Sequence, residues 1–448
     1  MEKTPLDSWI AQKIGANGGS SGLSGDELEK YQFSKLKDTI SYVRINSAFY
    51  RRTLENYDIG SLDSLNDLSQ FPFTRQEDIA ENGPQFVCVS QGKIERIVSL
   101  NYAGASMITK RLYFTSQDLD LTIDFFHQGM STFTRPGQRV FVMVPGDRPY
   151  SVGDLLATAL GRLDAEGIVY GFVQDPADAI REIVRLEIDV LVGTPVNVLS
   201  LVRHSDHALM LAPRIKAVLL SSDYVSPAIV REIENVWGCK VYSHYGSTEM
   251  GYGGGVECEA VSGYHLREAD LLFEVVDPDS NEPKKPGDVG EVVFSTLTRE
   301  GMPLIRYRTG DLSRFVDGPC ACGSALRRLD RIRGRLSEFV RIGSDEWLGI
   351  PDLDDVLFAI PELLDYEVTL KGEQDANELD IVLETNAIDT KGVVERARNS
   401  IIQLDALRKA FNDRLIRIGT ISFGEVAKIR SSAQKRAIID RRTGRAYN

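Results

Sequence analysis

The chain has 448 residues, of which 42% are apolar, and carries a formal net charge of −13. This length is enough for at least two domains with a large buried core. The acidic balance and the lack of a long basic block argue against a nucleic-acid partner. No run of 18 apolar residues occurs, so no membrane span or membrane partner is expected. The N-terminus, MEKTPLDSWI, has no apolar signal core, so we expect a cytoplasmic protein.

The first predicted element is a helix within residues 30–57, where apolar residues recur at helical spacing among charges. Further along, strand-like and helix-like segments alternate. The strand-like segments are 139–146, 167–173, DVLVGTP, 215–223 and KVYSHYGSTE; the helical ones are YSVGDLLATALGRLDAEG, DPADAIREIVRLEI and SPAIVREIENVWG. Such alternation predicts parallel βαβ units, in which ligands bind at the carboxyl ends of the strands. Three segments lie at such ends: Gly-Thr-Pro (193–195), Ser-Ser-Asp (221–223) and YGSTE (245–249).

The pattern changes after residue 265. LLFEVVD and GEVVFSTL are separated by a turn-rich connection, which predicts an antiparallel section. Residues 331–339 have the character of a hinge, and the remainder has strands and helices of its own. We therefore predict an α/β fold with a large N-terminal domain, 1–334, that combines a parallel βαβ sheet with an antiparallel section. A small, mobile α+β domain, 335–448, completes it.

Three short motifs occur in order along this pattern. They are YGSTEMG (245–251), RYRTGDL (306–312) and GRLSEF (334–339). Each motif alone is weak evidence for a function, because a YGSTE loop can be a capped turn and a Gly-Asp pair is common in loops. Together, at this spacing on an α/β pattern, they resemble the adenylate-forming enzymes, and within them the phenylacetate–CoA ligase-like family. The resemblance covers roughly residues 30–442.

The resemblance implies roles for the YGSTE loop. Tyr245 and Gly246 would frame adenine, and Ser247 belongs to the same nucleotide-binding loop. Thr248 would contact phosphate, and Glu249 would hold Mg²⁺, a hard cation that favours carboxylate and phosphate oxygens. The competing interpretation is that these are turn residues only.

The other two motifs would complete the nucleotide site. In the family, the Asp of the GDL motif grips the ribose hydroxyls, which corresponds to Asp311 here. The Arg of the GR motif also reaches the nucleotide, which corresponds to Arg335. The implied activity is ATP-dependent activation of a carboxylic acid, with an aromatic acid as one candidate, followed by acyl transfer to coenzyme A or another nucleophile.

Four residues form a candidate metal site. They are Cys258, His265, Cys320 and Cys322. Three thiolates and one imidazole fit a closed, tetrahedral Zn²⁺ site with a structural role. Members of the resembled family often carry such a cluster, which would tie the loop after YGSTE to the loop after RTGDL. The alternative is three buried thiols and an incidental histidine.

The stretch NYAGASMITKR, residues 101–111, occupies the place of the family's phosphate loop, TSG(T/S)TGxPK. Gly104, Ser106 and Lys110 are retained, and Ser106 and Lys110 are expected to bind nucleotide. Met107 replaces the second glycine and would crowd the approach of backbone amides to phosphate. The other departures are Tyr102, Ala103 and Ala105. The sequence therefore predicts a degenerate phosphate loop.

A second departure lies near the C-terminus. Aligned on AIIDRR, the family's catalytic Gly-Lys falls on Ala433 and Gln434, and glutamine cannot carry the positive charge. Lys435 and Lys428 are close in sequence and could substitute. We take Lys435, together with Thr248 and Glu249, as the candidate catalytic residues.

Three hypotheses follow for the function. The first is an acyl-adenylating ligase with an altered phosphate loop. The second is a homologue impaired in adenylation that keeps only acyl transfer. The third is a non-catalytic partner subunit, which would be expected to lose YGSTE and RTGDL as well. The expected cofactors are ATP or AMP, Mg²⁺, structural Zn²⁺ and, for the transfer step, coenzyme A; a homodimer is left open.

Overall fold

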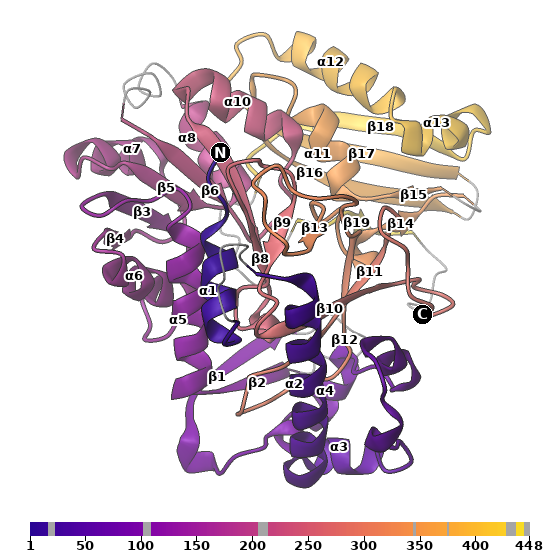
Figure 1. Ribbon diagram of the computed structural model, residues 1–448. Coiled ribbons are helices and arrows are strands. Elements are labelled where there is room, and N and C mark those ends of the chain that lie inside the picture. The colour runs from indigo at the N-terminus through magenta and orange to yellow at the C-terminus, as the bar shows by residue number, and fades with distance from the viewer. Residues whose placement is uncertain are drawn as a thin grey trace. The chain divides into compact units, whose positions relative to one another are not determined.

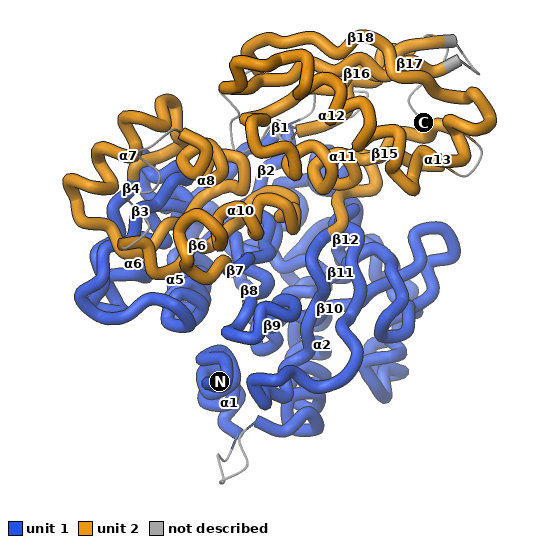
Figure 2. Tube along the Cα trace, turned by 90° about the horizontal axis from the view of Figure 1, so that it is seen from above, with its two compact units in different colours: residues 1–169, 242–332 blue, residues 170–241, 333–448 orange. Residues whose placement is uncertain are grey.

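The computed structural model describes residues 1–16, 23–101, 109–204, 214–343, 346–373, 376–426 and 436–442. Two compact units divide the chain (Figure 2): Met1–Val169 with Tyr242–Ile332, and Tyr170–Val241 with Arg333–Asn448. The predicted domain boundary at residues 334 and 335 stays a prediction. Among the described helices, none combines the length and apolar character needed to cross a membrane.

The first unit begins with helices (Figure 1). These are α1 (Pro5–Lys13), α2 (Gly25–Asn46), α3 (Ala48–Thr53) and α4 (Gln76–Asn82). The predicted helical structure within residues 30–57 is confirmed, although the chain breaks at Ser47 and so forms two helices. The Ser47 hydroxyl donates to the carbonyl of Gln85 at 2.8 Å and accepts the backbone N–H of Tyr50 at 3.2 Å. It thereby caps α3 and ends α2.

The middle of the first unit contains a hairpin and a βαβ unit. Its elements are β1 (Ile94–Asn101), β2 (Thr109–Thr115), α5 (Ser116–Met130), β3 (Arg139–Met143), α6 (Val152–Arg162) and β4 (Glu166–Val169). β1 and β2 pair antiparallel, with Asn101 opposite Thr109 at the loop end. β3 and β4 pair in parallel across α6, as the alternating pattern predicts. Four of the five β3 residues are buried, which explains its continuous apolar run.

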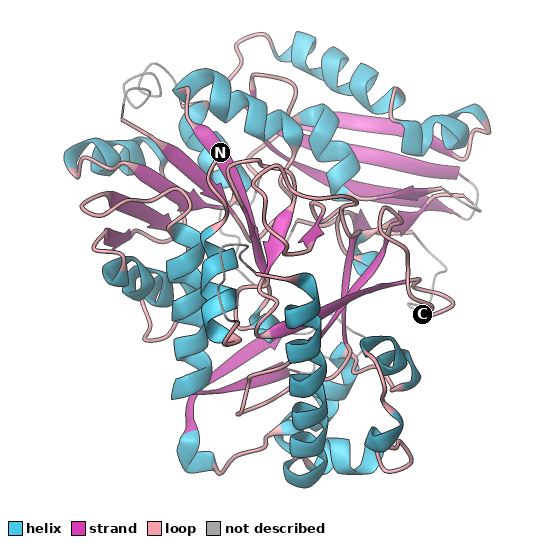
Figure 3. Cartoon of the chain, in the orientation of Figure 1, coloured by secondary structure: helices cyan, strands magenta, loops and turns pink. Residues whose placement is uncertain are grey.

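The rest of the first unit is antiparallel (Figure 3). β7 (Lys240–Tyr245), β8 (Gly255–Glu257), β9 (Tyr264–Leu266) and β13 (Arg328–Leu329) pair in that order. β10 (Leu271–Val276), β11 (Gly290–Thr296) and β12 (Tyr307–Ser313) form a three-stranded sheet. This confirms the predicted antiparallel section. Along β12, alternate residues are buried, so Tyr307 and Asp311 share one face.

The second unit also has two kinds of structure. Its earlier part contains α7 (Pro176–Arg185), β5 (Val190–Gly193), α8 (Pro195–Val202), β6 (Ala217–Leu220) and α10 (Pro227–Trp237), with β5 and β6 parallel. Its later part contains β14 (Val340–Arg341), β15 (Trp347–Leu348), α11 (Ile350–Leu357), β16 (Leu363–Glu373), β17 (Ala376–Thr385), α12 (Thr390–Ile402), α13 (Asp405–Asn412), β18 (Ile416–Phe423) and β19 (Ile439–Asp440). The predicted α/β class with a C-terminal α+β section is confirmed.

A buried ion pair joins the two parts of the second unit. The Arg436 guanidinium donates to both carboxylate oxygens of Asp354 and lies 3.7 Å from Asp223 in the loop after β6. It also lies over the rings of Phe358 and Tyr366. Because removing one partner would leave an uncompensated buried charge, the pair fixes residue 436 within this unit.

Candidate active site and metal centre

The YGSTEMG loop leaves β7 through a turn that its glycines make possible. A Cβ at Gly246 would lie 2.2 Å from the carbonyl oxygen of Tyr252, and Gly251 has a φ of +71°. Between them, Thr248–Met250 forms a single 3-10 turn. The half-buried Ser247 has a buried Oγ for which the described residues offer no hydrogen-bond partner. A buried hydroxyl of this kind is typical of a site that receives a polar ligand.

Tyr245 connects this loop to the RTGDL motif. Its hydroxyl donates to Oδ2 of Asp311 at 2.9 Å, although the two residues are 66 positions apart. Asp311 is 3% exposed and lies on β12, and its backbone N–H donates to Thr309 at 2.9 Å. Gly310, directly before Asp311 in the same strand, has a left-handed φ of +75°, which glycine adopts without strain. Two motifs singled out by sequence therefore meet through side chains.

Glu249 lies in a buried cluster of charged and polar groups. The Lys110 ammonium, from the start of β2, forms an ion pair with Oε1 of Glu249. The Tyr307 hydroxyl donates to the same oxygen at 3.0 Å, and Gln76 accepts from the ammonium at 3.3 Å. The structure thus brings the predicted phosphate-loop lysine against the predicted Mg²⁺ carboxylate.

Two contacts hold the backbone around Glu249. The Arg299 guanidinium donates to the Glu249 carbonyl at 2.6 Å, and the Thr122 hydroxyl of α5 donates to the Gly251 carbonyl at 2.9 Å. The guanidinium carbon of Arg299 lies 5.0 Å from the ring centroid of Phe114. Burial lowers the pKa of Arg299. The loop is therefore hydrogen-bonded to α5 directly and connected to β2 through Arg299.

Sequence reasoning missed Tyr307, Gln76 and Arg299. The strand parity of RYRTGDL could have indicated Tyr307, because it shares a face with Asp311. No local pattern singles out Gln76 or Arg299.

None of the three other predicted residues belongs to the described part of the first unit. Arg335 lies in the second unit, where its backbone N–H donates to Glu338 at 3.2 Å. Ser106 and Lys435 lie outside the described residues, as do Met107 and Gln434. The predicted degeneracy of the phosphate loop therefore stays a prediction.

His244 on β7 provides a pH-dependent element beside the loop. Its ring centroid lies 6.0 Å from those of Phe125 and Phe126, and burial lowers its pKa from 6.5 to about 4. A folded-state pKa below the unfolded value means that the unfolded chain binds the proton first as pH falls. Stability contributed by neutral His244 is present above pH 6.5 and is lost as pH falls towards 4.

We expect the free energy of unfolding to fall by about 2 kcal/mol between pH 7 and pH 5 from this group alone. Urea denaturation at the two pH values measures the fall. His244→Gln removes the titration, so the variant should lose less stability over the same interval. An equal loss in the variant and the wild type would contradict the assignment.

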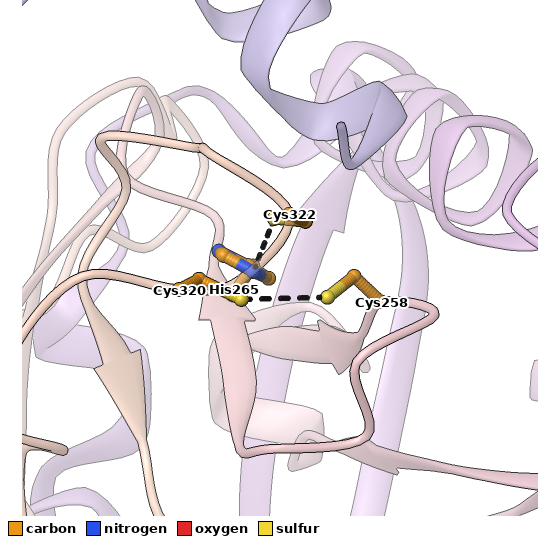
Figure 4. A group of neighbouring side chains, drawn as sticks. All are labelled: Cys258, His265, Cys320 and Cys322. Atoms are coloured by element: carbon orange, nitrogen blue, oxygen red, sulfur yellow. Dashed lines mark hydrogen bonds between the residues drawn. The ribbon is translucent and has the colours of Figure 1, made fainter. Parts of the chain in front are cut away.

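The four candidate metal ligands meet in the first unit (Figure 4). Cys258 follows β8, His265 lies on β9, and Cys320 and Cys322 lie between β12 and β13. Their ligand atoms all lie within 4.8 Å of one another, and all four residues are buried. The Sγ atoms of Cys258 and Cys320 are 3.7 Å apart, and Sγ of Cys322 is 3.4 Å from Nε2 of His265.

These distances fit a tetrahedral zinc centre. With bonds of roughly 2.3 Å to sulfur and 2.0–2.1 Å to nitrogen, the edges of the tetrahedron are about 3.8 Å and about 3.5 Å. Burial lowers the pKa of His265 to about 4, which keeps the imidazole neutral as a ligand must be. Burial also raises the pKa of Cys258 to about 12, so a thiolate there requires a cation. Among the described groups, none hydrogen-bonds Nδ1 of His265.

Helix α1 contacts the loop that carries the last two cysteines. Asp7 accepts a hydrogen bond from the Ser324 hydroxyl at 2.8 Å and from the Ala325 N–H at 3.3 Å. Lys13, at the other end of α1, forms an ion pair with Asp270 at 2.6 Å. The N-terminal helix and the cysteine loop therefore stabilise each other.

Residues 131–298 match the family of AMP-binding enzymes. This match and the sequence similarities below support the AMP-binding, adenylate-forming superfamily, with distant homology to the phenylacetate–coenzyme A ligases.

Particular relatives agree with this class. The chain is 27% identical over 417 residues to the phenylacetate–coenzyme A ligase of Thermus thermophilus, covering 88% of this chain and 90% of that protein. It is 29% identical over 337 residues to the enzyme of the same name from Escherichia coli, covering 71% and 74%. A 2-hydroxyisobutyryl-CoA ligase in the postadenylation state, in complex with R3-HIB-AMP, superposes with a TM-score of 0.78 at 20% identity, covering 93% of this chain and 90% of that chain. The structural likeness shows the fold.

Proposed function

We propose that the chain is an adenylate-forming ligase that activates a carboxylic acid with ATP and transfers the acyl group to coenzyme A. The observation that carries the proposal is the paired arrangement in the first unit, where Tyr245 contacts Asp311 and Lys110 contacts Glu249. Nucleotide ligands bind at the carboxyl ends of strands in this fold class. The chemistry of the four residues suits ribose, phosphate and a divalent cation.

Each residue has a role in the proposed first step. Asp311 accepts hydrogen bonds from the ribose hydroxyls, and Tyr245 fixes the orientation of the Asp311 carboxylate. Ser247 and Thr248 donate to phosphate oxygens, and Lys110 neutralises phosphate charge. In this step a carboxylate oxygen attacks the α-phosphorus, the bond to the β-phosphate oxygen breaks, and pyrophosphate leaves.

Glu249 suits a magnesium site. Its Oε1 pairs with the Lys110 ammonium, so Mg²⁺ would take the place of the ammonium at this oxygen and leave Lys110 to the phosphates. Mg²⁺ usually takes one or two carboxylates together with substrate phosphates. When bound, it would offset the charge that gathers on the phosphates.

In the proposed second step the thiol of coenzyme A attacks the acyl carbon, the acyl–phosphate bond breaks and AMP leaves. The distant homology to ligases named for phenylacetate supports an aromatic acid as substrate. Zinc held by the four buried ligands would have a structural role, because four side chains fill its tetrahedral coordination and leave no position for water or substrate.

The function is tested by nucleotide binding and turnover. Calorimetry with ATP and with AMP should detect both ligands. Pyrophosphate exchange over a panel of aromatic and short aliphatic acids should then identify an acid that supports exchange. Binding of neither nucleotide would contradict the proposal.

The replacement of the family's lysine by Gln434 predicts slow adenylation. We expect Gln434→Lys to raise pyrophosphate exchange, because single electrostatic donors at such sites change rates on the order of 10²–10³. Thioester formation from a synthetic acyl-adenylate should change little. This asymmetry separates a slow ligase from an enzyme restricted to acyl transfer, which would use only the preformed adenylate.

Lys428→Ala and Lys435→Ala provide the control. If wild-type exchange is as fast as in an ordinary ligase and either substitution removes it, the lysine has moved in sequence. The proposed weakening at position 434 would then be wrong.

A further inference from the structure

Tyr307 lies between the two charged groups of the cluster. Its hydroxyl is 3.0 Å from Oε1 of Glu249 and 3.4 Å from Nζ of Lys110. A phenol has one hydrogen to donate and lone pairs to accept with, so it can donate to the carboxylate and accept from the ammonium at once. The hydroxyl thus fixes both ends of the ion pair.

The ring of Tyr307 is held rigidly. The residue is 1% exposed, pairs with Phe294 across β11 and β12, and has its ring centroid 5.4 Å from that of Phe294. Thr74 forms a parallel bridge with Tyr307 on the other side. A hydroxyl on a packed, buried ring has one position available, which makes it a precise orienting group.

Strand β12 therefore presents two functional side chains on one face. Asp311 meets Tyr245, and Tyr307, four residues earlier, meets Glu249. The spacing of alternate residues along a strand keeps both in a fixed relation. A single strand would then set the distance between the group that binds the ribose and the group that orients the Mg²⁺ ligand Glu249.

We propose that Tyr307 is a positioning residue that orients Glu249 for magnesium-dependent binding of ATP. The inference rests on the proposed function. It predicts that the hydroxyl matters for ligands that bring a divalent cation and phosphates, and has little effect on AMP, which is held by its ribose.

Tyr307→Phe tests the proposal, because it keeps the ring and removes only the hydroxyl. Calorimetry should show AMP binding within about twofold of wild type and ATP binding at 1 mM Mg²⁺ weakened by about tenfold or more. Raising Mg²⁺ should recover part of the loss. Tyr50→Phe is the matched control, since Tyr50 is equally buried and its hydroxyl contacts Thr74 and Ile305.

The outcomes are distinct. Equal Mg²⁺ dependence of ATP binding in Tyr307→Phe and wild type overturns the inference. So does a parallel loss of AMP and ATP binding, which would indicate a general packing role, and so does the same selective loss in Tyr50→Phe. A wild-type protein that binds neither nucleotide contradicts the proposed function itself, and the inference falls with it.

Discussion

Asp311→Ala is expected to weaken binding of both AMP and ATP by at least about 100-fold. Two ribose hydroxyls would each donate to the carboxylate, and charge-assisted hydrogen bonds are worth roughly 1.5–3 kcal/mol each. The substitution also removes the partner of the buried Tyr245 hydroxyl. Calorimetry with each nucleotide measures the effect.

Two further variants show whether the effect belongs to the carboxylate. Asp311→Asn keeps the shape and loses the charge, so it should fall between wild type and Asp311→Ala. Met107→Gly removes bulk from the predicted phosphate loop and should leave binding intact or improve it. Unchanged affinity in Asp311→Ala would mean that nucleotide does not bind beside Tyr245.

The second large effect is expected from loss of metal. Purified protein should contain about one zinc ion per chain, and Cys320→Ala should lose it. Structural zinc stabilises small domains by up to roughly 10–16 kcal/mol, so we expect a loss on the order of 5 kcal/mol or more. Elemental analysis and denaturant unfolding measure the two quantities.

Cys239→Ala is the matched control for this experiment. Cys239 is also buried and free, but it belongs to no cluster of ligands among the described residues. Its substitution should cost only the cavity left by one sulfur atom. Protein without zinc, or equal destabilisation by the two substitutions, would contradict a structural metal.

The alternating fold could be predicted because its signals are local. SPAIVREIENVWG becomes α10, with Ser226 accepting from the N–H of Ala228 and Gly238 ending the helix at a φ of +66°. The candidate zinc ligands could be predicted from residue type and count, although Cys258 and Cys320 are 62 positions apart. Ligand chemistry is restrictive enough that four such residues point to one site.

The features that could not be predicted from the sequence depend on tertiary contacts. The break at Ser47 comes from a hydrogen bond to Gln85, 38 residues away. Arg299 reaches the Glu249 carbonyl across 50 residues, and Gln76 reaches Lys110 across 34. No periodicity or motif encodes such approaches, because each depends on how separate elements pack.

The proposed reaction passes through an acyl-adenylate, formed from ATP and a carboxylic acid. The most direct measurement uses a substrate acid labelled with ¹⁸O in its carboxylate, together with ATP, Mg²⁺ and coenzyme A. If the acid attacks the α-phosphorus, one labelled oxygen must appear in the released AMP, and Asp311→Ala should abolish this product. Unlabelled AMP, or AMP formed without acid, would contradict the proposed function.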